Sequence, residues 1–473
     1  MRLLPQRYCR HVIMGIVYMF HSGFFAIPMY AQELQWKVFG HLQESRVGFC
    51  AAAIGYGKVL VIGGFSEQRG NQNHRVRGSV TSSCEMIDIK SRRITSASSM
   101  HSPHAFACVL QTKDSSIVII SGLNTDSITT PVCEMYDRKK NEWRVLGSLL
   151  IGRHQHSAAF LNDEEIIVVG GIAKYNYGAS IAEAEVLNIR TGQSRFVDDF
   201  PDKCCFGVSI SSRIFFSQSP LFFGGRGESG ISYHLSNMYC FDKVSSHWVR
   251  LGTFPEAMCA LSFQRLFDGR LIVSGGRKKD NTVSANNIVQ SSNIYLENPG
   301  GFSFIGLMLR PRSWSSLEQW NNDILLIIGG SDNGRVSLSR CEWFDLQTHQ
   351  SIEGPAMNEA RNSHTSVSFP TFDNQGRQEG ACILVVGGFD AQNRSLSSVE
   401  ILETTNPQLL EVPNPEIASQ RLKKLLTSPT VIATLAGFIL ILIAGLIYLL
   451  YQVLIIRRQS KFSYQSNAVG GHK

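Results

Sequence analysis

The chain has 473 residues, enough for several domains, and a formal net charge of +7. Three arginines within residues 1–31 and four basic residues within residues 457–473 account for the whole net charge, so residues 32–456 are formally neutral. The basic balance belongs to the two ends of the chain, and it gives no support to nucleic-acid binding.

The first 31 residues have the layout of a secretory signal. Arg2, Arg7 and Arg10 precede an apolar run at residues 12–20, and the small residue Ala31 follows a second apolar patch. A basic start, a short apolar run and a small residue are the order found in signal peptides, so we expect cleavage near Ala31. Polar residues interrupt the apolar run, which leaves an uncleaved signal-anchor as the alternative.

A short apolar run that ends in two small residues occurs seven times between residues 59 and 388. The spacing between consecutive pairs is 49 to 58 residues. The first small residues are Gly63, Ser121, Gly170, Gly224, Gly275, Gly329 and Gly387. A period near 50 residues indicates a propeller array. Each run, rich in Val and Ile and ended by Gly-Gly, is typical of a buried strand stopped by a turn.

Three further segments accompany these runs, and they predict four strands per repeat. An Arg- or Pro-led segment comes about ten residues earlier and predicts the innermost strand, strand a, at residues 46–52, 103–109, 153–159, 255–261 and 361–367. The Gly-Gly run is strand b. A segment such as Cys133-Glu134-Met135-Tyr136-Asp137 predicts strand c, and Trp143 and Trp248 begin the clearest examples of strand d. Four antiparallel strands in a radial repeat form a propeller blade.

These marks resemble the kelch repeat, with Gly-Gly after strand b, aromatic-Asp at the end of strand c and Trp at the start of strand d. The starts of strand a at residues 153–157 and 361–365 also match that family. The resemblance covers residues 32–412 and implies an all-β, seven-bladed kelch-type β-propeller. Blade 2 departs from the pattern with Ser121-Gly122, and residues 277–310 of blade 5 are hard to align.

Residues 36–40 have the strand-d pattern, although they precede every other predicted strand. Unpaired strand edges invite association, so a ring has to cover its ends. We therefore predict that the segment beginning at Trp36 is the outer strand of blade 7 and closes the ring. Residues 408–412 are the competing candidate for that place.

Ten cysteines follow the predicted signal. Cys84, Cys133 and Cys341 share one repeat position, and Cys50 and Cys259 share another. Bridged Cα atoms must lie within about 7 Å, and equivalent positions of different blades are expected to lie farther apart. We predict that these cysteines are small core residues. So many free thiols are unusual in a secreted protein, and the sequence leaves this conflict with the signal open.

Residues 430–456 carry no charged side chain and consist mostly of Leu, Ile, Val and Ala. About 20 such residues span a bilayer, so we predict a single C-terminal transmembrane helix after a linker at residues 413–429. The N-terminal signal orients the chain, with the propeller extracytoplasmic and the basic tail, residues 457–473, in the cytoplasm. Ala433 and Gly437 have the small-xxx-small spacing that can support a weak helix-mediated dimer.

Motifs for phosphate binding, zinc hydrolysis and activated serine nucleophiles do not occur, so no catalytic residue, cofactor or metal is predicted. His154 and His156 lie two apart on the predicted strand a and could together hold a metal. The kelch-type strand start explains His156 without one. The recurring aromatic-Asp pair, such as Tyr136-Asp137, is expected to be structural because catalytic groups are seldom copied into many repeats.

Antiparallel strands place the b–c and d–a loops on one face of the ring. The b–c loops of blades 1 and 5, residues 65–82 and 277–290, are long and polar. Loops on a rigid scaffold often carry binding residues. The candidate ligand- or partner-binding residues on this face are Arg69, Arg75, Arg77, Arg226, Arg277, Lys278 and Lys279.

The predicted function is a membrane-anchored binding module that holds a protein or a glycan at this face. The alternative is an extracytoplasmic carbohydrate-active enzyme, because kelch-type propellers include a sialic-acid mutarotase and copper oxidases of the galactose-oxidase type. The oxidases need two His, two Tyr and a Tyr–Cys link, and this sequence does not present that set. The mutarotase type stays open. A pocket that groups an acid, an Arg and a His at the channel mouth favours an enzyme, whereas an open face favours binding.

Overall fold

A computed structural model describes residues 34–55, 57–67, 78–124, 128–173, 180–211, 219–227, 234–279, 288–332, 336–372 and 378–403. All of them belong to the first of two compact units, Met1–Leu410, and none to the second, Glu411–Lys473. The predicted signal, linker, spanning helix and tail lie outside the described residues, as does the competing strand at residues 408–412. Within the described ranges, no helix is long and apolar enough to cross a bilayer.

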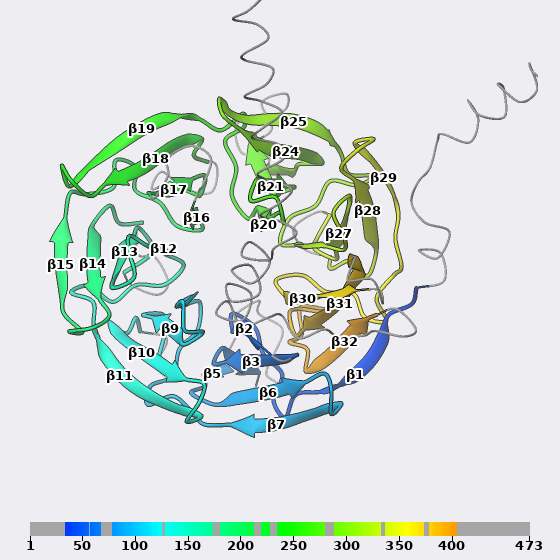
Figure 1. Cartoon of the computed structure of the whole chain (residues 1–473), viewed down its shortest axis with the longest axis horizontal. Helices are drawn as coiled ribbons and strands as arrows, with labels where there is room; N and C mark the ends of the chain where they lie inside the picture. Colours follow the sequence, from blue (N-terminus) through cyan, green and yellow to red (C-terminus); the bar gives the residue numbers. More distant parts are fainter. Residues whose placement is uncertain are drawn as a thin grey trace, which may run out of the picture. The chain divides into compact units, whose positions relative to one another are not determined.

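Seven four-stranded antiparallel sheets are arranged around a central axis as the blades of a propeller (Figure 1). This confirms the seven-bladed all-β fold. Blade 1 contains β2 (Cys50–Gly55), β3 (Lys58–Ile62), β6 (Cys84–Asp88) and β7 (Arg93–Ala97). Blade 2 contains β8 (Cys108–Gln111), β9 (Ile117–Ile120), β10 (Val132–Asp137) and β11 (Glu142–Ser148). Blade 3 contains β12 (Ser157–Phe160), β13 (Glu165–Val169), β14 (Ala184–Asn188) and β15 (Ser194–Val197).

The remaining blades follow the same order from the innermost to the outermost strand. Blade 4 contains β16 (Val208–Ser211), β17 (Pro220–Phe223), β18 (Asn237–Asp242) and β19 (His247–Thr253). Blade 5 contains β20 (Ser262–Arg265), β21 (Leu271–Ser274), β24 (Asn293–Asn298) and β25 (Gly301–Leu307). Blade 6 contains β26 (Ser316–Gln319), β27 (Ile324–Ile328), β28 (Cys341–Asp345) and β29 (Gln350–Glu353). Blade 7 contains β30 (Thr365–Phe372), β31 (Gln378–Val386), β32 (Ser398–Leu402) and β1 (Lys37–His41).

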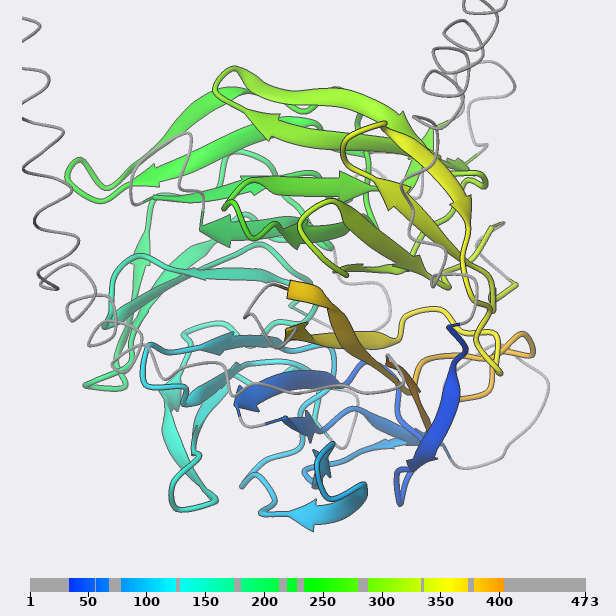
Figure 2. The same ribbon diagram turned by 45° about the vertical axis from the view of Figure 1, so that its right-hand side comes forward.

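The N-terminal strand closes the ring, as predicted from the pattern at Trp36. β1 pairs antiparallel with β32, with Lys37 opposite Ile401 and His41 opposite Ser398. Figure 2 shows blue β1 beside orange β32 from a second direction. The first strand of the chain is therefore the outer strand of the last blade, which covers an edge that would otherwise be exposed.

The predicted positions of strand a were wrong by several residues. In blade 1 the strand begins at Cys50 and not at Arg46, and in blade 5 the observed Ser262–Arg265 does not overlap the predicted 255–261. The reason is local geometry. A residue within the predicted segment, Gly48 in blade 1 and Ala260 in blade 5, has a positive φ, which interrupts an extended strand.

The Gly-Gly pairs are required where strand b ends against the next blade. In blade 3, Gly170 has a φ of +63°, and a Cβ atom there would lie 2.4 Å from the carbonyl oxygen of Cys204. Blade 2 has Ser121 at this position with a φ of 52°. Its hydroxyl donates to the carbonyl oxygen of Thr130 at 2.6 Å and accepts from the backbone N–H of Arg153 at 2.9 Å. These hydrogen bonds explain how a serine is accommodated there.

A buried ion pair joins strand c to the segment before strand a in four blades. The pairs are Arg46–Glu85 at 3.0 Å, Arg153–Glu185 at 2.5 Å, Arg361–Glu400 at 2.6 Å, and Arg312–Glu342. Each arginine also donates to the carbonyl oxygen of the first Gly of its own blade, as Arg153 does to Gly170 at 3.0 Å. One side chain thus ties strands b and c to the start of strand a.

The other three blades show that the acid and the base of this pair are kept or lost together. In blade 2, His104 replaces the arginine, and its Nε2 lies 3.4 Å from Glu134. Burial alone raises the pKa of Glu134, but the neighbouring His104 and hydrogen bonds from His101 and Ser102 lower it to about 2. Blades 4 and 5 have Cys204 and Met258 at the position of the arginine. At the strand-c position of the glutamate, both blades have a tyrosine. An unpaired charge is therefore not left in these cores.

The ten described cysteines are all free, and eight of them are buried. This confirms that Cys84, Cys133, Cys259 and Cys341 are core residues, whereas Cys50 is only partly buried. Burial raises the pKa of the Cys133 thiol to about 12. At neutral pH such thiols are protonated and poorly reactive.

Candidate functional site

Seven residues with positive φ form a ring around the axis, on the face of the propeller where the Gly-Gly pairs lie. Each precedes strand a of one blade, and together they are Gly48, Phe106, Gln155, Phe206, Ala260, Trp314 and Ser363. The N–H of Phe106 donates to the carbonyl oxygen of Gly48 at 2.7 Å, and the same bond recurs from blade 2 to 3, 3 to 4, 5 to 6 and 6 to 7. Because these bonds join neighbouring blades at five of the seven junctions, the positive-φ residues surround the channel mouth.

The residue directly after each Gly-Gly pair adds a second set of side chains to this mouth. It forms a β-bridge with the residue that precedes the positive-φ position, as in Val47 with Phe65 and Cys259 with Arg277. The local fold of each blade therefore brings two side chains to the mouth, one from the segment before strand a and one from the segment after strand b.

Aromatic rings occupy much of the mouth. In blades 1 and 2, the ring centres of Phe65 and Phe106 lie 5.5 Å apart, and those of Phe106 and His154 lie 6.4 Å apart. Phe206 and Trp314 contribute further rings from blades 4 and 6, and both are half-buried. Rings of this kind offer flat contact area at a low cost in conformational entropy.

Two arginines from neighbouring blades lie over these aromatic faces. The guanidinium carbon of Arg226 is 5.8 Å from the ring centre of Phe206, and that of Arg277 is 4.9 Å from the ring centre of Trp314. Both distances suit a cation–π interaction, which fixes the orientation of the guanidinium plane. Arg226 and Arg277 occupy the same repeat position, directly after the Gly-Gly pairs of blades 4 and 5.

The electrostatics place both guanidinium groups close to Cys259. Burial raises the pKa of the Cys259 thiol to about 11, and the positive charges of Arg277 and Arg226 oppose that rise. The Nε atom of Arg277 is buried, and no acceptor among the described residues bonds to it. A donor of this kind gains free energy when a ligand supplies the missing acceptor.

Four of the seven predicted binding residues lie in the part of the chain that the structure describes. Arg226 and Arg277 lie at the mouth. Lys278 has an internal partner, since its Nζ lies 2.5 Å from Glu256, and this pair lowers the pKa of Glu256 against the effect of burial. Lys279 ends the short strand β22 (Arg277–Lys279), which pairs with β23 (Ile288–Gln290). Arg69, Arg75 and Arg77 lie outside the described residues.

The sequence analysis missed the aromatic residues of the ring. Phe106, Phe206 and Trp314 stand two residues after the position that Arg occupies in blades 1, 3, 6 and 7. This offset recurs in every blade, so aligning the repeats at that position would have found them. No strands were predicted in the two long b–c loops. Each in fact begins as a hairpin, β4 (Phe65–Glu67) with β5 (Gly78–Val80) in blade 1, and β22 with β23 in blade 5.

The proposal that His154 and His156 share one strand face is wrong. β12 begins at Ser157, and Gln155 between the two histidines has a positive φ, so the simple alternation of a strand does not apply. Burial lowers the pKa of His154 to about 4 and that of His156 to about 3. Within the described part of the chain, no three His, Cys, Asp or Glu side chains are grouped as metal ligands.

Comparisons with known proteins agree with this architecture. Residues 321–358 match the family model of the Kelch motif, so the chain is a kelch-motif seven-bladed β-propeller. The structure is similar to a fungal alcohol oxidase of the AA5 family in complex with copper, with a TM-score of 0.56 and 15% identity over 78% of this chain and 76% of that chain. At this identity the likeness shows the fold alone.

A second solved structure, that of YjhT, has a TM-score of 0.48 and 14% identity, covering 67% of this chain and 99% of that chain. This similarity is too low to carry an argument about the site. No match to the chain was found among curated protein sequences.

Proposed function

We propose that this kelch propeller is a binding module that holds an acidic group of a protein or glycan partner at the channel mouth, between Arg226 and Arg277. The observation that supports the proposal is the pair of guanidinium groups on aromatic faces in equivalent positions of neighbouring blades.

The physical reason lies in preorganisation. A guanidinium group donates in a fixed planar fork that fits a carboxylate, and stacking on an aromatic ring holds that fork in place before the partner arrives. The neighbouring rings of Phe206 and Trp314 also give apolar area that a sugar ring or a peptide side chain can cover. Side chains of this type, Trp and Arg above all, dominate the binding free energy of known interfaces.

The enzymatic alternative has a weaker basis. The fungal oxidase shares the fold at 15% identity, and its copper belongs to that protein. The described ring residues and the residues after the Gly-Gly pairs include arginine and lie beside His154, but none of them is a carboxylate. We therefore place the function in recognition, and the experiment below also measures catalysis.

Arg277→Ala is expected to weaken capture of the partner by roughly tenfold or more, which is about 1.4 kcal/mol of binding free energy. The measurement is affinity capture of surface proteins and glycans with the full-length chain, followed by titration of the captured partner at two salt concentrations. Arg250→Ala is the matched control, since Arg250 is exposed on the outer strand β19 of blade 4.

Equal losses in Arg277→Ala and Arg250→Ala would contradict the proposed site. Oxidation or epimerisation of a sugar by the purified chain, abolished by a substitution at the mouth, would establish the enzyme in place of the binding module.

We further propose that residues 430–456 anchor this module in a membrane, with residues 1–31 as the signal, the propeller outside and residues 457–473 in the cytoplasm. The support is the uncharged apolar run followed by Arg457 and Arg458. Protease added to intact cells is expected to remove the propeller and spare an epitope tag on the tail. Protection of the propeller would show the opposite orientation, and release of the whole chain by alkaline carbonate would argue against a membrane span.

A further inference from the structure

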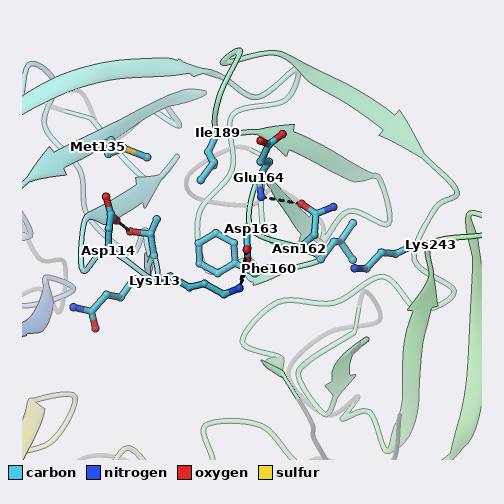
Figure 3. A pocket seen from close by; sticks show the side chains of 12 residues that line it. Lys113, Asp114, Met135, Phe160, Asn162, Asp163, Glu164, Ile189 and Lys243 are labelled. Carbon is cyan, nitrogen blue, oxygen red and sulfur yellow. Dashed lines mark hydrogen bonds and ion pairs between the residues drawn. The ribbon is translucent and has the colours of Figure 1, made fainter. Parts of the chain in front are cut away.

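A second hollow lies on the face opposite the Gly-Gly pairs, between blades 2 and 3. It has a volume of about 990 Å³. Figure 3 shows the side chains that line it. Its walls are the a–b turns of these two blades, with Lys113 and Asp163 at their tips, and the c–d turns that contain Ile189 and Lys243. Turns of these two kinds connect the strand ends that lie away from the Gly-Gly pairs, so this hollow is separate from the arginine pair at the mouth.

The floor of the hollow is an exposed part of the core between two blades. Met135, Phe160 and Ile189 line it, and all three belong to the apolar cluster that packs blade 2 against blade 3. Met135 and Phe160 are only half-buried here. An apolar side chain of a ligand that covered them would complete this core, and the burial would favour binding.

The walls keep their shape because each turn is hydrogen-bonded within itself. In blade 2, the N–H of Thr112 donates to the carbonyl oxygen of Ser116 at 2.9 Å. In blade 3, the N–H of Leu161 donates to the carbonyl oxygen of Glu165 at 2.8 Å. The side-chain oxygen of Asn162 accepts from the backbone N–H groups of Glu164 and Glu165, each at 2.8 Å. The hollow is therefore present before any ligand binds.

Most charges on the rim already have partners. Lys113 Nζ lies 2.6 Å from Asp163 and joins the two a–b turns, although both side chains are strongly exposed. Glu164 pairs with Arg190 at 3.5 Å. Asp114 accepts from the hydroxyl of Thr112 and from the N–H of Ser116, and these bonds lower its pKa, so it stays charged.

Lys243 is the exception. It is half-buried on the rim of the hollow, on the c–d turn of blade 4, and no partner for its ammonium group occurs among the described residues. Three carboxylates on the rim, those of Asp114, Asp163 and Glu164, would repel a ligand with several negative charges. Lys113 and Lys243 disfavour a strongly basic one. The charge pattern fits a ligand with a single carboxylate and a mostly apolar body.

We propose that this hollow binds the C-terminus of a peptide that ends in large apolar residues. The terminal carboxylate meets Lys243, and the last side chains cover Met135, Phe160 and Ile189. The volume lies at the upper end of the usual range for ligand pockets, about 300 to 1,000 Å³, which suits a few residues better than a single amino acid.

The test measures binding of a labelled peptide, N-acetyl-Gly-Ser-Leu-Phe with a free carboxylate, to the purified full-length chain. Saturable binding is expected, with at least tenfold weaker binding of the C-terminal amide. Lys243→Met is expected to give the same tenfold loss for the free acid and no change for the amide. Lys140→Met is the matched control, because Lys140 is exposed on the c–d turn of blade 2 and does not line the hollow.

Phe160→Ala tests the floor and is expected to weaken both the acid and the amide, with the melting temperature recorded to show that the variant is folded. Equal binding of acid and amide, or an unchanged affinity in folded Lys243→Met, overturns the proposal. Octanoate that competes better than the peptide would assign the hollow to fatty acids and also overturn it. Arg277→Ala leaves this binding unchanged, so failure here is distinct from failure of the site at the mouth.

Discussion

Arg361→Met is expected to destabilise the propeller by about 3–5 kcal/mol, because it leaves a buried carboxylate without its counter-ion. Arg361 and Glu400 are both fully buried, and their side chains lie 2.6 Å apart. Arg361 also donates to the carbonyl oxygens of Gly387 at 3.0 Å and Ser398 at 3.3 Å. The substitution therefore removes bonds to strands b and c of blade 7 at once, and the measurement is chemical denaturation of the full-length chain.

The double variant Arg361→Met/Glu400→Gln separates the lost charge from the lost packing. Blades 4 and 5 already lack both members of the pair, so this fold accepts a blade without them. We expect the double variant to recover a large part of the stability that Arg361→Met loses, since no charge remains buried alone. If the double variant is no more stable than Arg361→Met, the cost comes from packing and not from the unpaired carboxylate.

Trp36→Ala is expected to lower the free energy of unfolding by about 3–5 kcal/mol, the usual cost of removing a large buried aromatic side chain. Trp36 is 5% exposed and belongs to the apolar cluster between blades 6 and 7. The indole N–H of Trp36 donates to the carbonyl oxygen of Pro355 at 3.0 Å. The side-chain amide of Asn358 donates to the carbonyl oxygen of Trp36 at 3.1 Å. These contacts join the N-terminal strand to blade 6 as well as to blade 7.

Val38→Ala is the control for this prediction. Val38 lies two residues further on in β1, pairs with Glu400 and is 56% exposed, so its truncation should change stability by less than about 0.5 kcal/mol. Deleting residues 34–41 removes both the ladder with β32 and the indole, and should destabilise at least as much as Trp36→Ala. A deletion variant that unfolds at the same denaturant concentration as the unaltered chain would refute the role of β1 in closing the ring.

The repeat pattern predicted the fold because it depends on local and periodic requirements. Gly-Gly is needed at strand ends where φ is positive and the next blade lies within contact distance, as at Gly170. The aromatic-Asp pair at the end of strand c also has a local reason, since Asp137 accepts the N–H groups of Lys139 and Lys140 in the turn that follows. Such requirements recur in each blade, and recurrence makes them visible in a single sequence.

Contacts between side chains of different strands were harder to predict from the sequence. Arg153 and Glu185 stand 32 positions apart, and their buried ion pair follows only from the packing of strand c against the start of strand a. The predicted starts of strand a failed for a related reason. The positive φ of residues such as Gln155 and Trp314 comes from hydrogen bonds between neighbouring blades, which no local pattern records.

The sequence by itself determined the number of blades, the strand order within a blade and the closure at Trp36, because spacing and apolar runs encode them directly. It also singled out Arg226 and Arg277 as candidate binding residues. Only the tertiary structure decided that these two arginines lie over Phe206 and Trp314, whereas Lys278 is bound to Glu256. A contact between side chains of different blades depends on the curvature of the whole ring, and that curvature is set by the packing of all seven sheets together.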